Sequence, residues 1–386
     1  MFRPLVTVLT VFSLGSPAGV PAQEPAASPR LSTVLSDRDR DGYAEARTPR
    51  PFSFPADHGP HPEYRNEWWY VTGNLDDADG RRFGFELTLF RFALAPEPAE
   101  EDAGKAAAGS AWRTRQVHLA HFAVTDVAAG RFRFAERHAR GALGLAGATA
   151  EPFRVWVGDW WLREFPSSGE DAGNAWLLHA GTEELGATLT LVPEKPPVLN
   201  GENGLSQKSA DPGNASYYYS ISRIATRGTL RIDDAVYDVS GLSWLDREWG
   251  SSALADDQAG WDWFALQLSD GSDLMFYRLR RDDGSTDPMS AGTWIPARGD
   301  AVPLARGDVS LEPREHWESP RGGRYPVAWA LSVPRLELEL LIEPVLRDQE
   351  LDVSVRYWEG AVDVSGRRSG SPVDGRGYVE LTGYAE

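Results

Sequence analysis

Residues 242–250 read Leu-Ser-Trp-Leu-Asp-Arg-Glu-Trp-Gly, and the chain soon continues at residues 260–264 as Gly-Trp-Asp-Trp-Phe. Successive side chains of an extended strand point to opposite sides. Trp244, Asp246 and Glu248 would therefore share one face, and the odd-numbered Leu, Arg and Trp would share the other. Each face mixes an indole ring with charged groups, so neither is typical of a face turned to solvent. The pattern predicts a strand that is buried on both sides.

The acidic side chains of this strand allow two interpretations. Burying a carboxylate is costly unless it is paired or hydrogen-bonded, so the cluster marks either a functional site or a structural ion-pair lock. Glu67 poses the same question, because it would share a mostly apolar strand face with Trp69 and Val71. Burial would raise the pKa of Glu67 unless Arg65 or Arg247 pairs with it. The residues alone leave both interpretations open.

Composition limits the class of protein. The chain has 386 residues, enough for two domains, and a formal net charge of -18. A field of that sign repels phosphate backbones and anionic lipid surfaces, which argues against nucleic acid and membrane-surface partners. The sequence has no cysteine, so disulfides are unavailable, and its 15 tryptophans suit a large β core or an apolar pocket.

Residues 1–22 are typical of a secretory signal peptide. Arg3 supplies the positive charge, residues 5–14 the apolar core, and Val20-Pro-Ala a small-residue cleavage site. No apolar run is long enough to span a bilayer. We therefore expect a secreted or periplasmic protein. Residues 23–50, rich in Ala, Pro, Ser and charged residues, are predicted to form a linker or arm.

From Pro51 onward the sequence has the period of β-strands, and helical periodicity is almost absent. Residues 66–75 and 82–91 are strand-like and flank an Asp/Gly turn, which predicts a β-hairpin. The Pro/Gly/Asn/Ser-rich loop at residues 193–215 is long for a compact domain, and such loops are more often functional or mobile than accidental.

A second hairpin of the same kind begins at Gly260. Its aromatic pair, Trp263-Phe264, corresponds to Trp69-Tyr70 about 194 residues earlier, which indicates a duplicated β domain. The sequence therefore predicts an all-β protein of two barrel or sandwich domains, residues 51–243 and residues 244–386.

Histidines could supply acid–base or metal chemistry, but their spacing restricts both. His118 and His121 are three residues apart in a predicted strand, so their side chains would point to opposite faces. Either imidazole could present a polar tip to an apolar cavity. His58, His61 and Glu63 lie in a Pro/Gly-rich loop whose spacing favours no metal geometry. We predict no metal site and no cofactor.

Six motifs together carry a family resemblance. They are Pro51-Phe-x-Phe-Pro-x-Asp-His-Gly-x-His-Pro-Glu-Tyr-x-x-Glu-Trp-Trp-Tyr-x-Thr-Gly-Asn-Leu75, His118-x-x-His-Phe-Ala-x-Thr-Asp126, Trp244-x-Asp-x-Glu-Trp-Gly250, Gly260-Trp-Asp-Trp-Phe264, Tyr357-Trp-Glu-Gly-Ala-Val362 and Gly377-Tyr-Val-Glu-Leu-Thr-Gly-Tyr384. With these motifs the sequence resembles the carotenoid hydratase (hydroxyneurosporene synthase) and AttH-like family of secreted proteins. The resemblance implies two lipocalin-like β-barrel domains packed together.

The resemblance also implies a chemistry. Hydratase members add water to a terminal isoprenoid double bond without a cofactor, and other members are described as secreted hydrolases. A buried carboxylic acid would donate the proton, and aromatic faces would stabilise the carbocation. We expect the catalytic carboxylates among Asp246, Glu248, Asp262 and Glu67. We expect ligand contacts from Trp68, Trp69, Tyr70, His118, His121, Arg247, Trp249, Trp261 and Trp263.

One departure from the hydratase pattern is Arg247, where the hydratases carry histidine. A permanent cation beside the acid would lower the pKa of that acid and oppose a carbocation, which favours the AttH-like branch. Three functions stay open: an enzyme that hydrates or hydrolyses an apolar isoprenoid- or lipid-like molecule, a non-catalytic carrier of such a molecule, and a structural envelope protein. The first two require Trp249 and Trp263 to face a shared hollow at the domain junction.

Overall fold

A computed structural model describes residues 40–96, 114–165, 175–252 and 254–385. The predicted signal peptide lies outside these residues. The described chain is nearly all β: two curled antiparallel sheets, one nearly closed into a barrel and the other a half-barrel, carry almost every element. The predicted fold class is therefore confirmed. The helices are three short 3-10 turns, η1 (Ala56–His58), η2 (Arg306–Asp308) and η3 (Pro334–Leu336), and none of the described helices could cross a membrane.

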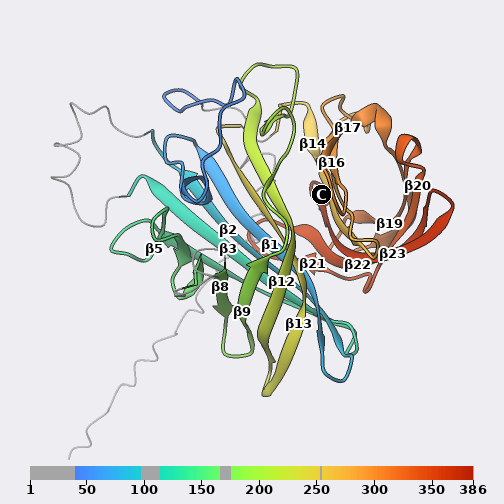
Figure 1. The fold of residues 1–386 in the computed structure, drawn as a ribbon. Helices are drawn as coiled ribbons and strands as arrows, with labels where there is room; N and C mark the ends of the chain where they lie inside the picture. The colour runs from blue at the N-terminus through green and yellow to red at the C-terminus, as the bar shows by residue number, and fades with distance from the viewer. Residues whose placement is uncertain (1–39, 97–113, 166–174, 253, 386) are drawn as a thin grey trace, which may run out of the picture.

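The first sheet has 13 described strands and holds β13 near its middle, between β1 and β12 (Figure 1). Its strand order is β4-β3-β2-β1-β13-β12-β9-β8-β7-β6-β5, with β10 and β11 also paired to β12. The strands are β1 (Asn66–Asp77), β2 (Arg82–Ala93), β3 (Gln116–Asp126), β4 (Arg131–Arg140), β5 (Ala146–Thr149), β6 (Arg154–Val157), β7 (Trp160–Glu164), β8 (Trp176–Gly181), β9 (Leu185–Pro193), β10 (Val198–Leu199), β11 (Leu205–Gln207), β12 (Ala215–Ile232) and β13 (Ala235–Gly250).

The second sheet has 10 described strands, and Figure 1 shows it curled into a ring. Its order is β17-β16-β15-β14-β23-β22-β20-β19-β18, with β21 also paired to β22. The strands are β14 (Gln258–Leu268), β15 (Asp273–Arg281), β16 (Ala291–Ile295), β17 (Val302–Ala305), β18 (Ser310–Glu318), β19 (Arg324–Val333), β20 (Leu338–Pro344), β21 (Glu350–Leu351), β22 (Tyr357–Arg368) and β23 (Ser371–Leu381).

Each sheet encloses its own apolar core, built from one side-chain face of its strands. Burial of a large aliphatic or aromatic side chain contributes about 1.5–3 kcal/mol, and both cores are rich in aromatic residues. The first core includes Trp69, Phe83, Phe122, Trp160 and Trp249, and the second includes Phe264, Trp294, Trp329 and Trp358. Seven of the described tryptophans are therefore residues of these two cores.

Residues 40–50, the described end of the predicted arm, lie against the first sheet. Ala46 is fully buried in the first core. The Tyr217 hydroxyl donates to the Thr48 carbonyl over 2.9 Å. The described part of this segment is thus packed on the first core.

The two sheets meet face to face, with β1, β2 and β12 of the first against β23, β22 and β14 of the second. A third buried cluster, which includes Tyr70, Trp244 and Trp263, joins them. The approach is tight at Gly84 on β2, where a Cβ atom would lie 2.6 Å from the Cβ of Ala361 on β22. Glycine at residue 84 therefore sets the distance between the sheets at this point.

Both predicted hairpins form, since β1 pairs with β2 and β14 with β15. The corresponding aromatic side chains of the two hairpins, however, face different surroundings. Trp69 points into the first core, whereas Trp263, its counterpart by sequence offset, packs between the sheets. Trp244, where the second domain is predicted to begin, lies within β13 of the first sheet, and the second sheet begins at Gln258.

A methyl group at residue 84 should push the sheets apart. We expect Gly84→Ala to lower the free energy of unfolding by about 1–3 kcal/mol, because overpacking a tight contact forces displacement. The double variant Gly84→Ala with Ala361→Gly should regain much of that loss in urea unfolding. Gly307→Ala is the control, because a Cβ there would meet no atom within 4 Å. Equal losses in the single and double variants would contradict the close contact.

Candidate active site

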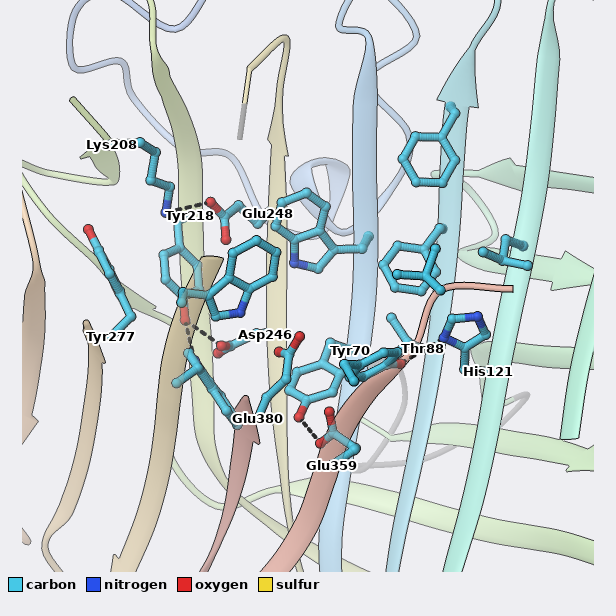
Figure 2. Close-up of a pocket in the computed structure, with 18 of the residues that line it drawn as sticks. Tyr70, Thr88, His121, Lys208, Tyr218, Asp246, Glu248, Tyr277, Glu359 and Glu380 are labelled. Atoms are coloured by element: carbon cyan, nitrogen blue, oxygen red, sulfur yellow. Dashed lines mark hydrogen bonds and ion pairs between the residues drawn. The ribbon is translucent and has the colours of Figure 1, made fainter. Parts of the chain in front are cut away.

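One pocket opens between the two sheets and encloses about 990 Å³, its open mouth included (Figure 2). Most of its wall is aromatic or aliphatic, and a smaller set of ionisable groups faces the same space. The apolar and phenolic lining is Trp68, Tyr70, Phe90, Phe92, Leu119, Tyr218, Trp261, Trp263, Tyr277, Leu279, Val355 and Tyr357. The remaining lining is Thr88, His121, Lys208, Asp246, Glu248, Glu359 and Glu380.

The first sheet contributes two rows of side chains that strand pairing holds in register. One row runs across β3, β2, β1, β13 and β12 as His121, Thr88, Tyr70, Asp246 and Ser220. Adjacent strands lie about 4.8 Å apart, so this row separates His121 from Asp246 by roughly 14 Å. The neighbouring row is Leu119, Phe90, Trp68, Glu248 and Tyr218. The pocket is therefore a slot with two ends.

The second sheet supplies the opposite wall. Tyr277, Trp263, Glu380 and Glu359 are paired across β15, β14, β23 and β22. Figure 2 shows Glu380 projecting toward Asp246, and Glu359 beside Tyr70. Carboxyl groups from both sheets therefore gather at one end of the slot.

Asp246 is buried at that end and accepts three hydrogen bonds. Trp244 Nε1 donates to Oδ1 over 2.7 Å, the Ser220 hydroxyl donates to the same oxygen, and the Tyr218 hydroxyl donates to Oδ2. Trp263 Nε1 in turn donates to the Tyr218 hydroxyl over 3.1 Å. Burial raises the pKa of Asp246 to about 7, although the three donors act in the opposite direction. Such a carboxyl can give and regain a proton near neutral pH.

Lys208 is the only permanent cation among the lining residues that the structure describes. Its Nζ lies 2.8 Å from Glu248 and donates to Ser206 Oγ over 3.0 Å. Burial acts to lower the pKa of Lys208, but the charge of Glu248 and the neighbouring Tyr277 outweigh burial, so the pKa is raised. Lys208 and Glu248 thus form a charged pair at the wall. The loop at residues 193–215, predicted to be functional or mobile, supplies this lysine.

Three further acids, Glu86, Glu359 and Glu380, come from β2, β22 and β23. Tyr70 donates to Glu359, and Thr88 donates to Glu86. Burial is the main reason that the pKa of Glu380 is raised to about 8 and that the pKa values of Glu86 and Glu359 lie well above their usual range. Repulsion among these acids adds to the effect. Each of the three groups therefore keeps its proton to a higher pH than an exposed carboxyl does.

His121 lies at the other end of the slot. Its Nδ1 is 2.7 Å from the Tyr357 hydroxyl, and its Nε2 is 3.1 Å from Glu136 on β4. Burial lowers the pKa of His121 against the opposing pull of Glu136. A neutral imidazole therefore links a partly exposed carboxylate to a phenol of the pocket.

Glu67 and Arg247 lie on the opposite face of the same sheet, within the first core. Glu67 is fully buried and accepts hydrogen bonds from Arg91, Arg247 and the His61 backbone N–H. The Arg247 guanidinium lies 3.9 Å from the Trp69 ring centroid. Burial alone would raise the pKa of Glu67, but the two guanidinium groups hold it well below its usual range. The ion-pair lock is the interpretation that fits Glu67.

The expectation that Arg247 lowers the pKa of the adjacent acid is wrong for Asp246. The pKa of Asp246 is raised, and Arg247 points to the other side of β13, where it pairs with Glu67. Residues next to each other in a strand face different surroundings.

Trp249 and Trp263 do not share a hollow. Trp249 lies in the first core with the His61 ring stacked on it at 3.8 Å, whereas Trp263 lines the pocket. The β13 indole nearest to Trp263 is that of Trp244, with ring centroids 6.4 Å apart. The hollow at the sheet junction is therefore lined from the other face of β13.

His118 and Asp262 also lie outside the pocket lining. His118 is buried on the side of β3 opposite His121, as the spacing predicts, and burial lowers its pKa to about 4. Asp262 is fully buried and paired with Arg278 at 2.6 Å and Arg280 at 3.2 Å. The described residues contain no cluster of potential ligands that could hold a metal ion.

The pocket thus brings together part of the predicted site. The predicted residues that line it are Trp68, Tyr70, His121, Asp246, Glu248, Trp261 and Trp263. The prediction omits Lys208, Tyr218, Tyr277, Tyr357, Glu359 and Glu380. The signal for Glu359 and Glu380 is present in the sequence, because both lie inside motifs that carry the family resemblance.

Fold and pocket together define a lipocalin-like protein of two curled sheets with an acid-lined pocket between them. The chain belongs to the AttH-like family, whose profile matches residues 45–384. No curated protein matches the sequence.

Three solved structures are similar over most of this chain. A candidate AttH protein from Nitrosomonas europaea is 34% identical with a TM-score of 0.75, over 88% of this chain and 99% of that one. Kievitone hydratase from Nectria haematococca is 15% identical with a TM-score of 0.65, over 89% and 97%. CghA, solved with Sch210972, is 12% identical with a TM-score of 0.52, over 90% and 98%. The last two likenesses establish the fold only.

Removing the charge of Glu67 should destabilise the first core. Glu67→Gln leaves Arg91 and Arg247 buried without a counter-charge, so we expect the free energy of unfolding to fall by about 3–5 kcal/mol. Urea unfolding followed by tryptophan fluorescence measures this loss. Glu343→Gln on the exposed face of β20 is the control and should change it by less than about 0.5 kcal/mol. A Glu67→Gln protein as stable as the control would rule out the lock.

Asp246→Asn should change the pH dependence of stability. The pKa of Asp246 rises from 3.8 to about 7 on folding, so the folded state keeps a proton that the unfolded chain releases between these values. Stability contributed by protonated Asp246 is complete below pH 4 and is lost as pH rises toward 7. Relative to wild type, the variant should gain stability between pH 4 and pH 8, on the order of a few kcal/mol. If the free energy of unfolding depended on pH in the same way in both proteins, folding would not raise the pKa of Asp246.

Proposed function

We propose that this protein is a secreted enzyme that binds an apolar, isoprenoid- or lipid-like small molecule between its sheets and adds water to a carbon–carbon double bond without a cofactor. The observation that carries the proposal is Asp246, a buried carboxyl with a pKa of about 7 that faces aromatic rings in the pocket between the sheets. A pocket with a mostly apolar and aromatic wall and a few converging ionisable groups also favours a binding or catalytic role over a purely structural one.

The proposed reaction uses the acids at one end of the slot. Protonated Asp246 donates its proton to one alkene carbon, and the second carbon becomes a carbocation beside the Trp68 and Trp263 rings. Water adds to the cation and releases a proton, for which the carboxylate that Asp246 became in the first step is the acceptor, while Glu380 faces the same space from the second sheet. A proton returned to Asp246 completes the cycle. Tyr218 holds the reacting carboxyl in place.

The apolar end of the slot fits the proposed substrate. Phe90, Phe92, Leu119 and Val355 line it, and the first three are partly exposed. The family membership and the fold shared with kievitone hydratase support a hydratase, although that neighbour is too distant in sequence to carry residue roles across. The signal-like residues 1–22 support secretion.

A carrier that uses the same pocket without turnover is the second candidate. The observation that favours it is the apolar end itself, where Phe90, Phe92, Leu119 and Val355 would hold a hydrophobic ligand by burial alone. Hydrolysis of a bound ester is less well supported, because Asp246 is surrounded by hydroxyl and indole donors rather than by a serine–histidine pair.

Hydration in labelled water separates these candidates. Purified protein is incubated with an isoprenoid alkene extract in H₂¹⁸O, and the enzyme should produce alcohols that carry the label. Asp246→Asn should reduce the rate roughly 10²–10⁴-fold, because the variant has no proton to donate. The wild-type rate should fall as pH rises through about 7, where Asp246 loses its proton. Unchanged ligand recovered from wild type and variant alike would establish the carrier.

A further inference from the structure

The ionisable groups of the pocket include more acids than bases. Lys208 is paired with Glu248, which leaves Asp246, Glu359 and Glu380 without a cationic partner among the residues that the structure describes. Glu359 is fully buried, and its Oε2 has no hydrogen-bond partner. In Figure 2 one oxygen of Glu359 meets Tyr70. The other oxygen therefore has hydrogen-bonding capacity that the described residues leave unused.

Aromatic faces surround the same end of the slot. Trp68 and Trp261 are partly exposed, and both line the pocket. Trp263 and Tyr70 pack edge to face with ring centroids 5.0 Å apart. Electron-rich ring faces attract a cation by about 0.5–2 kcal/mol each, and more as water is excluded. Rings and unpaired carboxyls therefore favour the same kind of ligand.

We infer that the pocket selects an organic cation, with an ammonium group between Asp246 and Glu380 and an apolar body directed toward Phe90, Phe92 and Leu119. This inference rests on the proposal that the pocket receives a small ligand, and it adds the charge that the ligand carries. A carbocation formed by protonating a double bond would carry the same positive charge as this ammonium group, at the same position in the pocket. A stable ammonium compound is therefore an analogue of that intermediate.

Cation binding is coupled to proton release. A cation between Asp246 and Glu380 stabilises their ionised forms, and their pKa values of about 7 and 8 place that change near neutral pH. The groups that face these two carboxyls from the packed strands and loop are Glu248, Lys208, Tyr218, Tyr277, Tyr70, Glu359 and Glu86. The pKa of Lys208 and that of Tyr218 are raised, so both keep their protons over this range. Affinity should therefore rise with pH.

A pair of ligands that differ only in charge tests the inference. Phenyltrimethylammonium and tert-butylbenzene have nearly the same shape, and neither one titrates. We expect the cation to bind at least about tenfold more tightly than the neutral compound at pH 8.5, measured by calorimetry and tryptophan quenching. Its affinity should fall roughly tenfold or more at pH 5.5, whereas that of tert-butylbenzene should not change. Calorimetry in phosphate and in Tris buffer should detect protons released only by the cation.

Variants locate the effect in the pocket. Asp246→Asn and Glu380→Gln should each lower the affinity for the cation about tenfold and leave the affinity for tert-butylbenzene unchanged. Glu343→Gln on the exposed face of β20 is the control and should change neither affinity. If a pocket variant does not fold, the inference is still tested on the wild-type protein, by the pH dependence of cation affinity and by the difference in affinity between the two ligands. Equal or stronger binding of tert-butylbenzene overturns the inference and leaves the proposed function standing. Binding of neither compound overturns both.

Discussion

The site depends on the alternation of side chains along β13, which makes one strand serve two chemically different spaces. Asp246 and Glu248 face the junction of the sheets, and Arg247 faces the first core. The separation is steric and cannot relax, because a shift by one residue would exchange every side chain on the two faces. A permanent cation can therefore lie next in sequence to Asp246 without entering the pocket.

The Glu67 ion pairs maintain this separation. Glu67 faces Trp249 across the β1–β13 pair and binds the Arg247 guanidinium, which is thereby fixed on the core side. Asp246 has only neutral donors, and burial raises its pKa, whereas the pKa of Glu67 is held low by two guanidinium groups. The same residue class thus acquires opposite proton affinities on opposite faces of one sheet.

The alternation of residues along the sequence predicted on which face of a strand each side chain lies, but not which side chains it contacts. Alternation correctly separated Asp246 from Arg247 and His118 from His121, because it depends only on the extended backbone. The prediction for Trp249 failed because Trp249 shares the face of β13 that turns into the first core with Arg247, whereas Asp246 and Glu248 on the other face line the pocket. The repeat also did not fix the phase of the aromatic pairs, since Trp69 enters a core and its counterpart Trp263 lies between the sheets.

Lys208 and Glu380 reach the pocket from a loop and from the last strand, and only tertiary packing brings them to Asp246. Each sheet fills its own interior with aromatic side chains. The pocket that Asp246 lines therefore lies between the sheets and not inside either one. The width of the pocket then depends on the docking distance of two separate cores, and the tight contact between Gly84 and Ala361 limits that distance. Carboxyl groups from β13, β22 and β23 face each other only at that distance. Their raised pKa values are therefore a property of the docked pair of sheets, because either wall alone would expose its acids to water.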